Sequence, residues 1–280
     1  MTNVKLLLTL CLMLVIDKIN AFQVYPSTGH LNIDLILDKK HYPTVANQAH
    51  GMWLMPWNWR NELNDLQREK IIANYKSDNI VVEIEMGHIN FKNANPDPIQ
   101  LTSAIKSGLN VHTLMIYNEG ENGSVLTQEN IKKAKALYGK KHKIISNCRE
   151  WNKGYEKVFS QLDGVSFEFQ VPNKLGEKKY NQVVTATKWA LANNKDIYYL
   201  SPAGHNNAHL NNAYFNGYKK FYAYLLKALG METMKSDNIY FSPANYNFKK
   251  TQVLMGPETS VNTVHGVAKW LLNQAEISSF

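Results

Sequence analysis

Three glutamates stand where strand-like or turn segments of the sequence end, and they are the residues best suited to carry out chemistry. Glu168 alternates with Phe167 and Phe169, and Glu85 alternates with apolar neighbours, in the period of two of a β-strand. Glu258 follows a Gly-Pro turn just before a helical pattern, where stabilisation of the helix N-terminus by its charge is the alternative to catalysis.

A carboxylate turned into a protein core is costly unless it is paired or hydrogen-bonded. Such a carboxylate favours a functional use, and structural pairing with Arg149 or a Lys is the alternative. Paired carboxylates are what glycosidic bond cleavage needs: one protonates the leaving oxygen, and the other is the nucleophile or the base.

Aromatic and polar residues follow the same strand ends. Aromatic side chains there can stack on sugar rings, and amide, imidazole or guanidinium groups can bond sugar hydroxyls or an acidic substituent. The candidate substrate-binding residues are Trp53, Trp57, Glu119, Asn147, Arg149, His205, Asn245 and Tyr246. We predict Glu168 as the general acid/base, with either Glu258 or Glu85 as its partner.

Short runs rich in Val, Ile, Tyr and Phe alternate with helical patterns, which favours parallel strands joined by helical crossovers. The predicted strands are Met52–Met55, Ile80–Met86, Val111–Tyr117, Lys143–Asn147, Val165–Phe169, Ile197–Leu200, Ile239–Ser242 and Gln252–Met255. This pattern predicts an α/β fold, a (β/α)8 TIM-type barrel, whose strands end at one active-site face. The segment Pro243–Thr251 is too short for a full crossover, so the seventh helix should be short or missing. An open doubly wound sheet is the alternative, although no Gly-rich phosphate loop follows the first strand.

Helix start and stop signals lie between the strands. Thr127 is the predicted N-cap of a helix that runs to Tyr138, and a long helix, Leu210–Leu229, should close at Gly230.

The first 21 residues differ from the rest. Lys5 precedes the apolar run Leu6–Ile16, and Ala21 offers a small residue for cleavage. The run is too short to span a bilayer and suits a signal peptide. We therefore expect residues 1–21 to be removed, leaving one domain, 22–280, that is secreted or periplasmic and is not inserted in a membrane. That domain keeps one cysteine, Cys148, which we interpret as a buried thiol rather than a nucleophile.

Other chemistries find little support in the sequence. No His-x-His or His-Glu-x-x-His pattern occurs, so we expect neither a metal site nor a cofactor. No Gly-x-Ser-x-Gly motif marks a nucleophilic serine. The net charge of +8 comes from scattered lysines without a nucleic-acid-binding motif.

With strand-end carboxylates ringed by Trp and Tyr, the chain resembles the broad class of exported (β/α)8 glycoside hydrolases. The resemblance implies a carbohydrate substrate and hydrolysis at the mouth of the barrel. In the largest clan of that class an Asn-Glu pair ends the fourth strand, whereas Asn118-Glu119 here follows the third predicted strand. A non-catalytic, exported carbohydrate-binding or surface protein on the same scaffold is the alternative.

Overall fold

The computed structural model describes twelve parts of the chain, and every structural statement below refers to them. They are residues 22–27, 39–54, 64–75, 79–85, 106, 108–117, 127–148, 150–168, 176–203, 213–245, 257–261 and 263–278. The segment 1–21, predicted to be a signal peptide, lies outside them.

Eight parallel strands form one sheet in the order β1-β8-β7-β6-β5-β4-β3-β2. Their bounds are β1 Gln23–Val24, β2 Gly51–Leu54, β3 Asn79–Glu85, β4 Val111–Tyr117, β5 Lys143–Cys148, β6 Gly164–Glu168, β7 Asp196–Ala203 and β8 Ile239–Asn245. The two ends of this sheet meet through a parallel bridge between Ser27 and Trp53, and Trp53 N donates to Pro26 O at 3.1 Å. The sheet therefore closes on itself, which confirms the (β/α)8 TIM-type barrel and excludes the open doubly wound sheet.

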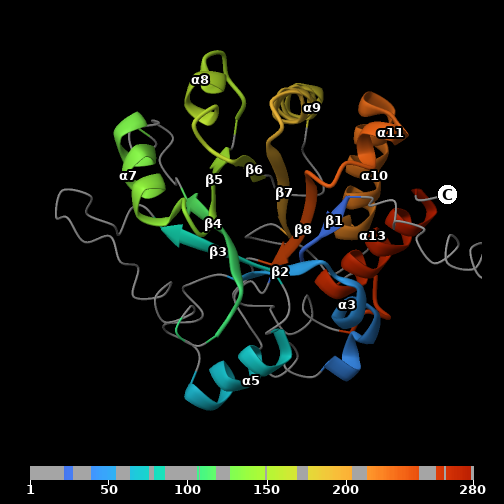
Figure 1. Ribbon diagram of the computed structural model, residues 1–280. Coiled ribbons are helices and arrows are strands. Elements are labelled where there is room, and N and C mark those ends of the chain that lie inside the picture. The colour runs from blue at the N-terminus through green and yellow to red at the C-terminus, as the bar shows by residue number, and fades with distance from the viewer. Residues whose placement is uncertain are drawn as a thin grey trace, which may run out of the picture.

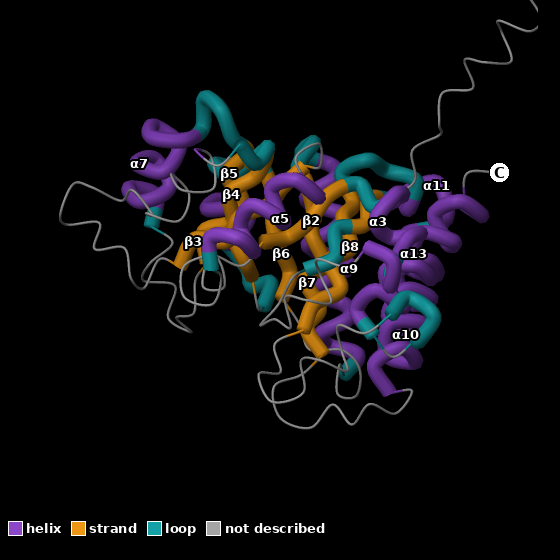
Figure 2. Tube along the Cα trace, turned by 90° about the horizontal axis from the view of Figure 1, so that it is seen from below, coloured by secondary structure: helices purple, strands orange, loops and turns teal. Residues whose placement is uncertain are grey.

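Helices surround the strands on the outside of the barrel (Figures 1 and 2). The described helical segments are η1 Lys39–His41, α3 Pro43–Gln48, α5 Asp65–Tyr75, α7 Gln128–Tyr138, α8 Tyr155–Phe159, α9 Glu177–Ala192, α10 Ala213–Leu229, α11 Met231–Met234 and α13 Val264–Ser278. Thr127 caps α7 as predicted, because its Oγ1 accepts from Asn130 N at 3.1 Å. Gly230, with φ of 83°, separates α10 from α11, which agrees with the stop signal predicted there.

The strand count differs from the prediction by one position. Seven predicted strands correspond to β2–β8, whereas β1 was not predicted and the predicted strand Gln252–Met255 lies outside the described residues. Counted from β1, the seventh connection joins β7 to β8 and holds α10 and α11. The sequence pattern predicts the short connection Pro243–Thr251 between a seventh and an eighth strand. In the structure this stretch begins within β8, which is the last strand of the barrel.

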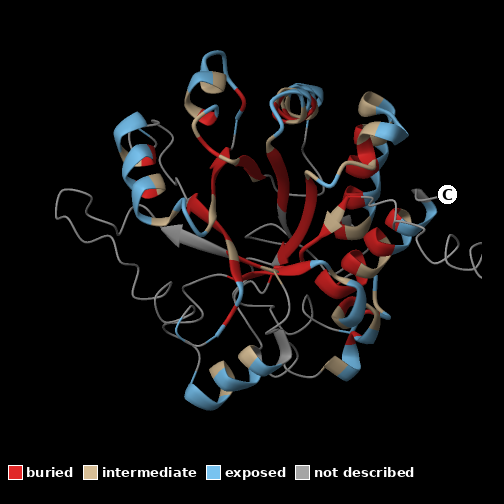
Figure 3. Ribbon diagram, viewed as in Figure 1, coloured by how far each residue is buried: buried red, intermediate tan, exposed pale blue. Residues whose placement is uncertain are grey.

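The buried side chains form two groups, one on each side of the sheet. The outer group lies between strands and helices, so that the helices are buried on their inner faces and exposed on their outer faces (Figure 3). The inner group, here called the lumen cluster, consists of Tyr25, Trp53, Val81, Met115, Ile145, Tyr198, Leu200, Tyr240 and Ala244. Strand alternation explains the division: on β8, Ile239 and Phe241 pack under helices while Tyr240 and Ala244 face the lumen.

Candidate active site at the mouth of the barrel

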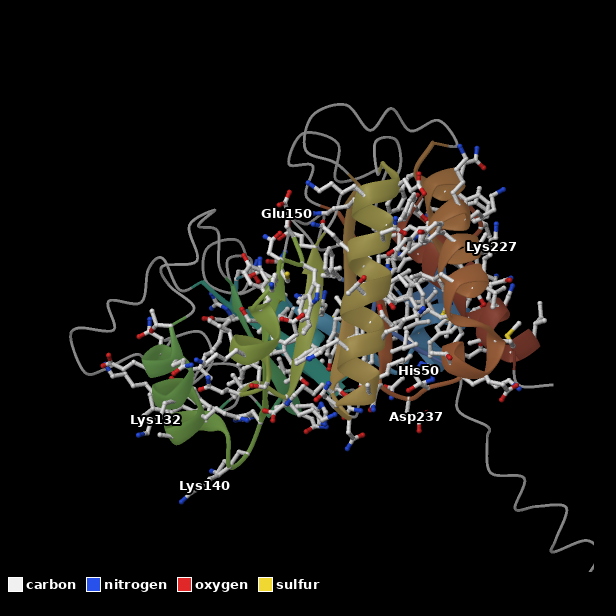
Figure 4. The ribbon with its side chains drawn as sticks, turned by 90° about the horizontal axis from the view of Figure 1, so that it is seen from above. His50, Lys132, Lys140, Glu150, Lys227 and Asp237 are labelled. Atoms are coloured by element: carbon white, nitrogen blue, oxygen red, sulfur yellow. The ribbon has the colours of Figure 1, made fainter. Side chains whose placement is uncertain are left out.

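Because all eight strands are parallel, their carboxyl ends meet at one end of the barrel, here called the mouth. Figure 4 shows the two ends of the barrel: Glu150 follows β5 at the mouth, while His50 and Asp237, which precede β2 and β8, lie at the opposite end. Active sites of TIM barrels are built at the mouth, so the predicted site residues are expected to lie there.

Glu168 is the last residue of β6 and stands at the mouth. It pairs in register with Leu200, a member of the lumen cluster, and it shares the lumen-facing side of β6 with the fully buried Ser166. The side chain is half-buried. Its Oε2 accepts a hydrogen bond from Asn147 Nδ2 at 3.4 Å. Asn147 comes from the neighbouring strand β5 and is itself 4% exposed, so β5 and β6 together hold the carboxylate over the lumen.

Aromatic rings fill the lumen beneath this carboxylate. The Tyr198 and Tyr240 rings are stacked with centroids 4.1 Å apart, and Trp53 meets Tyr198 edge-on at 5.7 Å. Burial raises the pKa of Tyr198 well above its ordinary value, so its phenol stays neutral. Trp53 is fully buried in this packing and does not lie at the rim, where a sugar ring would need it.

Glu258 lies away from the mouth, in the helix layer between α3 and α13. Its Oε2 accepts from Val45 N at 3.0 Å in the first turn of α3, and its Oε1 accepts from Lys269 Nζ on α13 at 2.9 Å. Its backbone N donates to His41 O at 2.9 Å. Burial alone raises the pKa of the Glu258 carboxyl, but hydrogen bonds, the strongest from Thr44, outweigh it and hold the pKa below its ordinary value. The carboxylate thus acts as a cap of α3 and as an ion-pair partner, and the structure does not bring it to Glu168.

The third candidate carboxylate, Glu85, ends β3 and pairs in register with Tyr117 on β4. Its side chain lies outside the described part of the structure, as do the side chains of Trp57, Glu119, Arg149, His205, Asn245 and Tyr246. Among the predicted site residues with described side chains, Asn147 and Glu168 are therefore the pair that the structure brings together.

Cys148 follows Asn147 on β5 but faces the outer core. Its thiol donates to Glu150 O at 2.9 Å, and burial raises its pKa to about 12. A thiol with such a pKa is not a nucleophile near neutral pH, which agrees with the interpretation of Cys148 as a buried structural thiol.

Two residues of the upper lumen, Ser166 on β6 and Ser242 on β8, were not predicted as site residues. Both are fully buried, and both lie on the lumen-facing side of their strands. The alternation of apolar and polar residues along these strands was the signal that pointed to them.

The described residues contain no group of three or more His, Cys, Asp or Glu side chains arranged to hold a metal ion. Nor does any helix within the described ranges combine the length and apolar character that crossing a bilayer requires.

No protein-family model and no curated protein matches this sequence. Solved structures do match it. A GH99 endo-alpha-mannosidase from Bacteroides thetaiotaomicron superposes with a TM-score of 0.53 and 9% identity, over 93% of this chain and 98% of its own. CpGH84B superposes with a TM-score of 0.51 and 12% identity, over 93% of this chain and 50% of its own. An orotidine 5'-monophosphate decarboxylase from Methanocaldococcus jannaschii follows with a TM-score of 0.49 and 11% identity, over 91% of this chain and 98% of its own. At their low identity, the first two likenesses show the TIM-barrel fold and nothing finer.

Proposed function

We propose that this protein is a glycoside hydrolase that cleaves a poly- or oligosaccharide at the mouth of the barrel, with Glu168 as general acid/base. The observation that supports it is the half-buried Glu168 carboxylate, hydrogen-bonded to Asn147 over a lumen of buried aromatic side chains. A carboxylate held in place at a strand end, partly shielded from water, is suited to proton transfer to a leaving oxygen.

Glu85 is the proposed second carboxylate, since Glu258 is engaged in the helix layer. It lies at the end of β3, and parallel strand ends meet at the mouth. Carboxyl groups about 5–5.5 Å apart would give retention of configuration, and groups about 6.5–9.5 Å apart would give inversion. The stereochemistry of the product, followed by NMR, therefore reports the separation of Glu85 and Glu168 in the working enzyme.

We also propose that residues 1–21 direct export and are then removed, so that the barrel works outside the cytoplasm. The apolar run of the segment supports this proposal, as does the start of β1 at Gln23, directly after it. Mass spectrometry of the protein recovered from the medium or the periplasm tests it, with a mature chain beginning at Phe22 as the expected result.

The test of the reaction is hydrolysis of a broad glycan panel by the chain 22–280 and by two variants. Glu168→Gln should lower kcat by about 10²–10⁴-fold, because it removes the transferable proton while keeping the size of the side chain. Glu232→Gln is the matched control: it makes the same change in an exposed residue of α11, which precedes β8 and lies away from the mouth, and it should leave kcat unchanged. Equal rates for the wild type and Glu168→Gln would refute the assignment.

A non-catalytic carbohydrate-binding protein is the second candidate function. The engagement of Glu258 with Val45 and Lys269 favours it, because that contact removes one of the two proposed partners of Glu168. Binding of a glycan by the wild type, measured by calorimetry, together with hydrolysis of none in the panel, would establish this alternative.

A further inference from the structure

Two buried hydroxyl groups in the upper lumen have no hydrogen-bond partner among the described residues. They are Ser166 Oγ on β6 and Ser242 Oγ on β8, both on residues with no exposed surface. A buried polar atom without a partner is uncommon in native proteins, and an unseen water is one of its regular explanations.

Other buried hydroxyls of this barrel are satisfied by the backbone. Ser146 Oγ donates to Ile116 O at 2.8 Å, and Thr187 Oγ1 donates to Val183 O at 2.8 Å. Both of these hydroxyls lie in the layer between the strands and the helices, where backbone carbonyl groups accept from them. The two lumen serines differ from this pattern, because no carbonyl group of the described residues accepts from them. The group that satisfies both hydroxyls is therefore expected in the lumen.

The register of the strands sets the two serines at one level of the barrel. Ser166 is paired with Tyr198, and Tyr198 with Tyr240, while Ser242 lies two residues further along β8. Strands of a TIM barrel are tilted, so residues of alternate strands that are offset in this way belong to one layer of lumen side chains. Ser166 and Ser242 accordingly lie on the lumen side at one level of the barrel, with β7 between their two strands.

The lumen changes in character at this level. Below it, the rings of Tyr198 and Tyr240 are stacked on each other. At and above this level, β6 and β8 contribute the small side chains Ser166, Ser242 and Ala244, and β7 contributes Leu200, which is paired with Ser242. Glu168 is the next lumen-facing residue of β6. Two hydroxyl side chains at the top of an aromatic column supply hydrogen-bonding groups of the kind that a buried water needs.

We propose that Ser166 and Ser242 together bind one buried water molecule, which forms the polar floor of the mouth beneath Glu168. Each hydroxyl both donates and accepts, so the shared water satisfies both of them. A further consequence rests on the proposed function. A sugar hydroxyl that enters the lumen to this depth would displace the water and form hydrogen bonds with Ser166 and Ser242 in its place.

A crystal structure of the chain 22–280 at a resolution that shows ordered water is the direct test, and it needs no substrate. We expect a water within hydrogen-bonding distance of both Ser166 Oγ and Ser242 Oγ. Hydroxyls turned onto backbone carbonyls, with no water between them, would overturn the proposal. Either result is independent of whether the protein hydrolyses glycans.

Thermal unfolding of alanine variants provides the second test. If the water is shared, Ser166→Ala and Ser242→Ala should each lower Tm by about 2–4 °C, the shift of a lost hydrogen bond in a chain of this size. The double variant should be scarcely worse than either single one, because both changes remove the same water. A Tm that rises in the single variants, as expected when an unsatisfied hydroxyl is removed, would contradict the proposal.

Ser146→Ala is the matched control for this cycle, because Ser146 is equally buried but bonds a carbonyl of β4. Combined with Ser242→Ala, it should give the sum of the two single shifts, since the two residues share no partner. Additivity in Ser166→Ala/Ser242→Ala as well would rule out a shared water.

Discussion

Replacement of Glu258 by Gln should destabilise the barrel and leave the proposed hydrolysis at its mouth unchanged. The carboxylate is 5% exposed and bonds Val45 N in the first turn of α3 and Lys269 Nζ on α13. Hydrogen bonds to a charged group contribute about 1.5–3 kcal/mol, against about 0.5–1.5 kcal/mol for a neutral pair. The amide of Gln keeps the neutral bond to Val45 but loses the charge next to the helix N-terminus, worth about 0.3–1 kcal/mol.

The ion pair with Lys269 adds little to that sum, because the Lys269 side chain is 36% exposed and can turn to water. We therefore expect Glu258→Gln to lower the free energy of unfolding by about 2 kcal/mol. Glu258→Ala, which leaves the Val45 amide without its partner, should cost about 3–4 kcal/mol.

Urea denaturation of the chain 22–280 measures both values. The matched control is Glu232→Gln, which removes an exposed carboxylate paired with Lys235 at 3.1 Å and should cost under about 0.5 kcal/mol. Kinetics on the folded fraction complete the experiment. A Glu258→Gln protein that has wild-type stability but has lost the proposed hydrolysis would refute the structural role and support Glu258 as a catalytic residue.

The same contact predicts a pH dependence. The pKa of Glu258 is lower in the folded chain than its ordinary value of 4.5. The unfolded chain therefore takes up the proton first as the pH falls, and folded stability decreases. The stabilisation should be fully present above pH 4.5 and lost as the pH falls through the lower, folded pKa. Glu258→Gln should show a weaker acid dependence than the wild type over this range.

Three further predictions concern other buried contacts. Lys143→Met removes the ammonium that lies 2.6 Å from the Asp196 carboxylate, which is 3% exposed. The free energy of unfolding, measured by urea denaturation, should fall by about 3 kcal/mol, and by less at acid pH, where the carboxyl is neutral. Cys148, with its pKa raised to about 12, should resist iodoacetamide at pH 8 in the folded chain and react once urea unfolds it, as peptide mass spectrometry would show. Tyr199→Phe removes a buried hydrogen bond of 2.7 Å to Thr187, whose hydroxyl keeps its bond to a backbone carbonyl, so thermal unfolding should show a loss of about 1 kcal/mol.

Many features of the barrel depend only on short segments of the chain and could be predicted from the sequence. The period of two along β6 and β8 and the helical patterns between strands are properties of short segments, and so is the cap at Thr127. The direction of Glu168 follows in the same way, because its neighbour Phe167 must lie under the helices.

Closure of the barrel could not be predicted in this way. β1 has two residues, and it counts as a strand because β8 pairs with it on one side and the Ser27–Trp53 bridge continues it on the other. A segment so short carries no periodicity of its own, so only its partners, far away in the sequence, define it.

The candidate site shows the same division. The sequence by itself determined that Glu168 and Asn147 lie near the ends of their strands and face the lumen, because alternation along a strand decides which side each residue faces. Only the tertiary structure decided that the two side chains meet, that Trp53 is buried among tyrosines, and that Glu258 caps α3 instead of reaching the mouth. The reason is physical: the depth of a side chain in the barrel depends on the register between strands, and the partner of a carboxylate in a turn depends on which distant helix packs beside it.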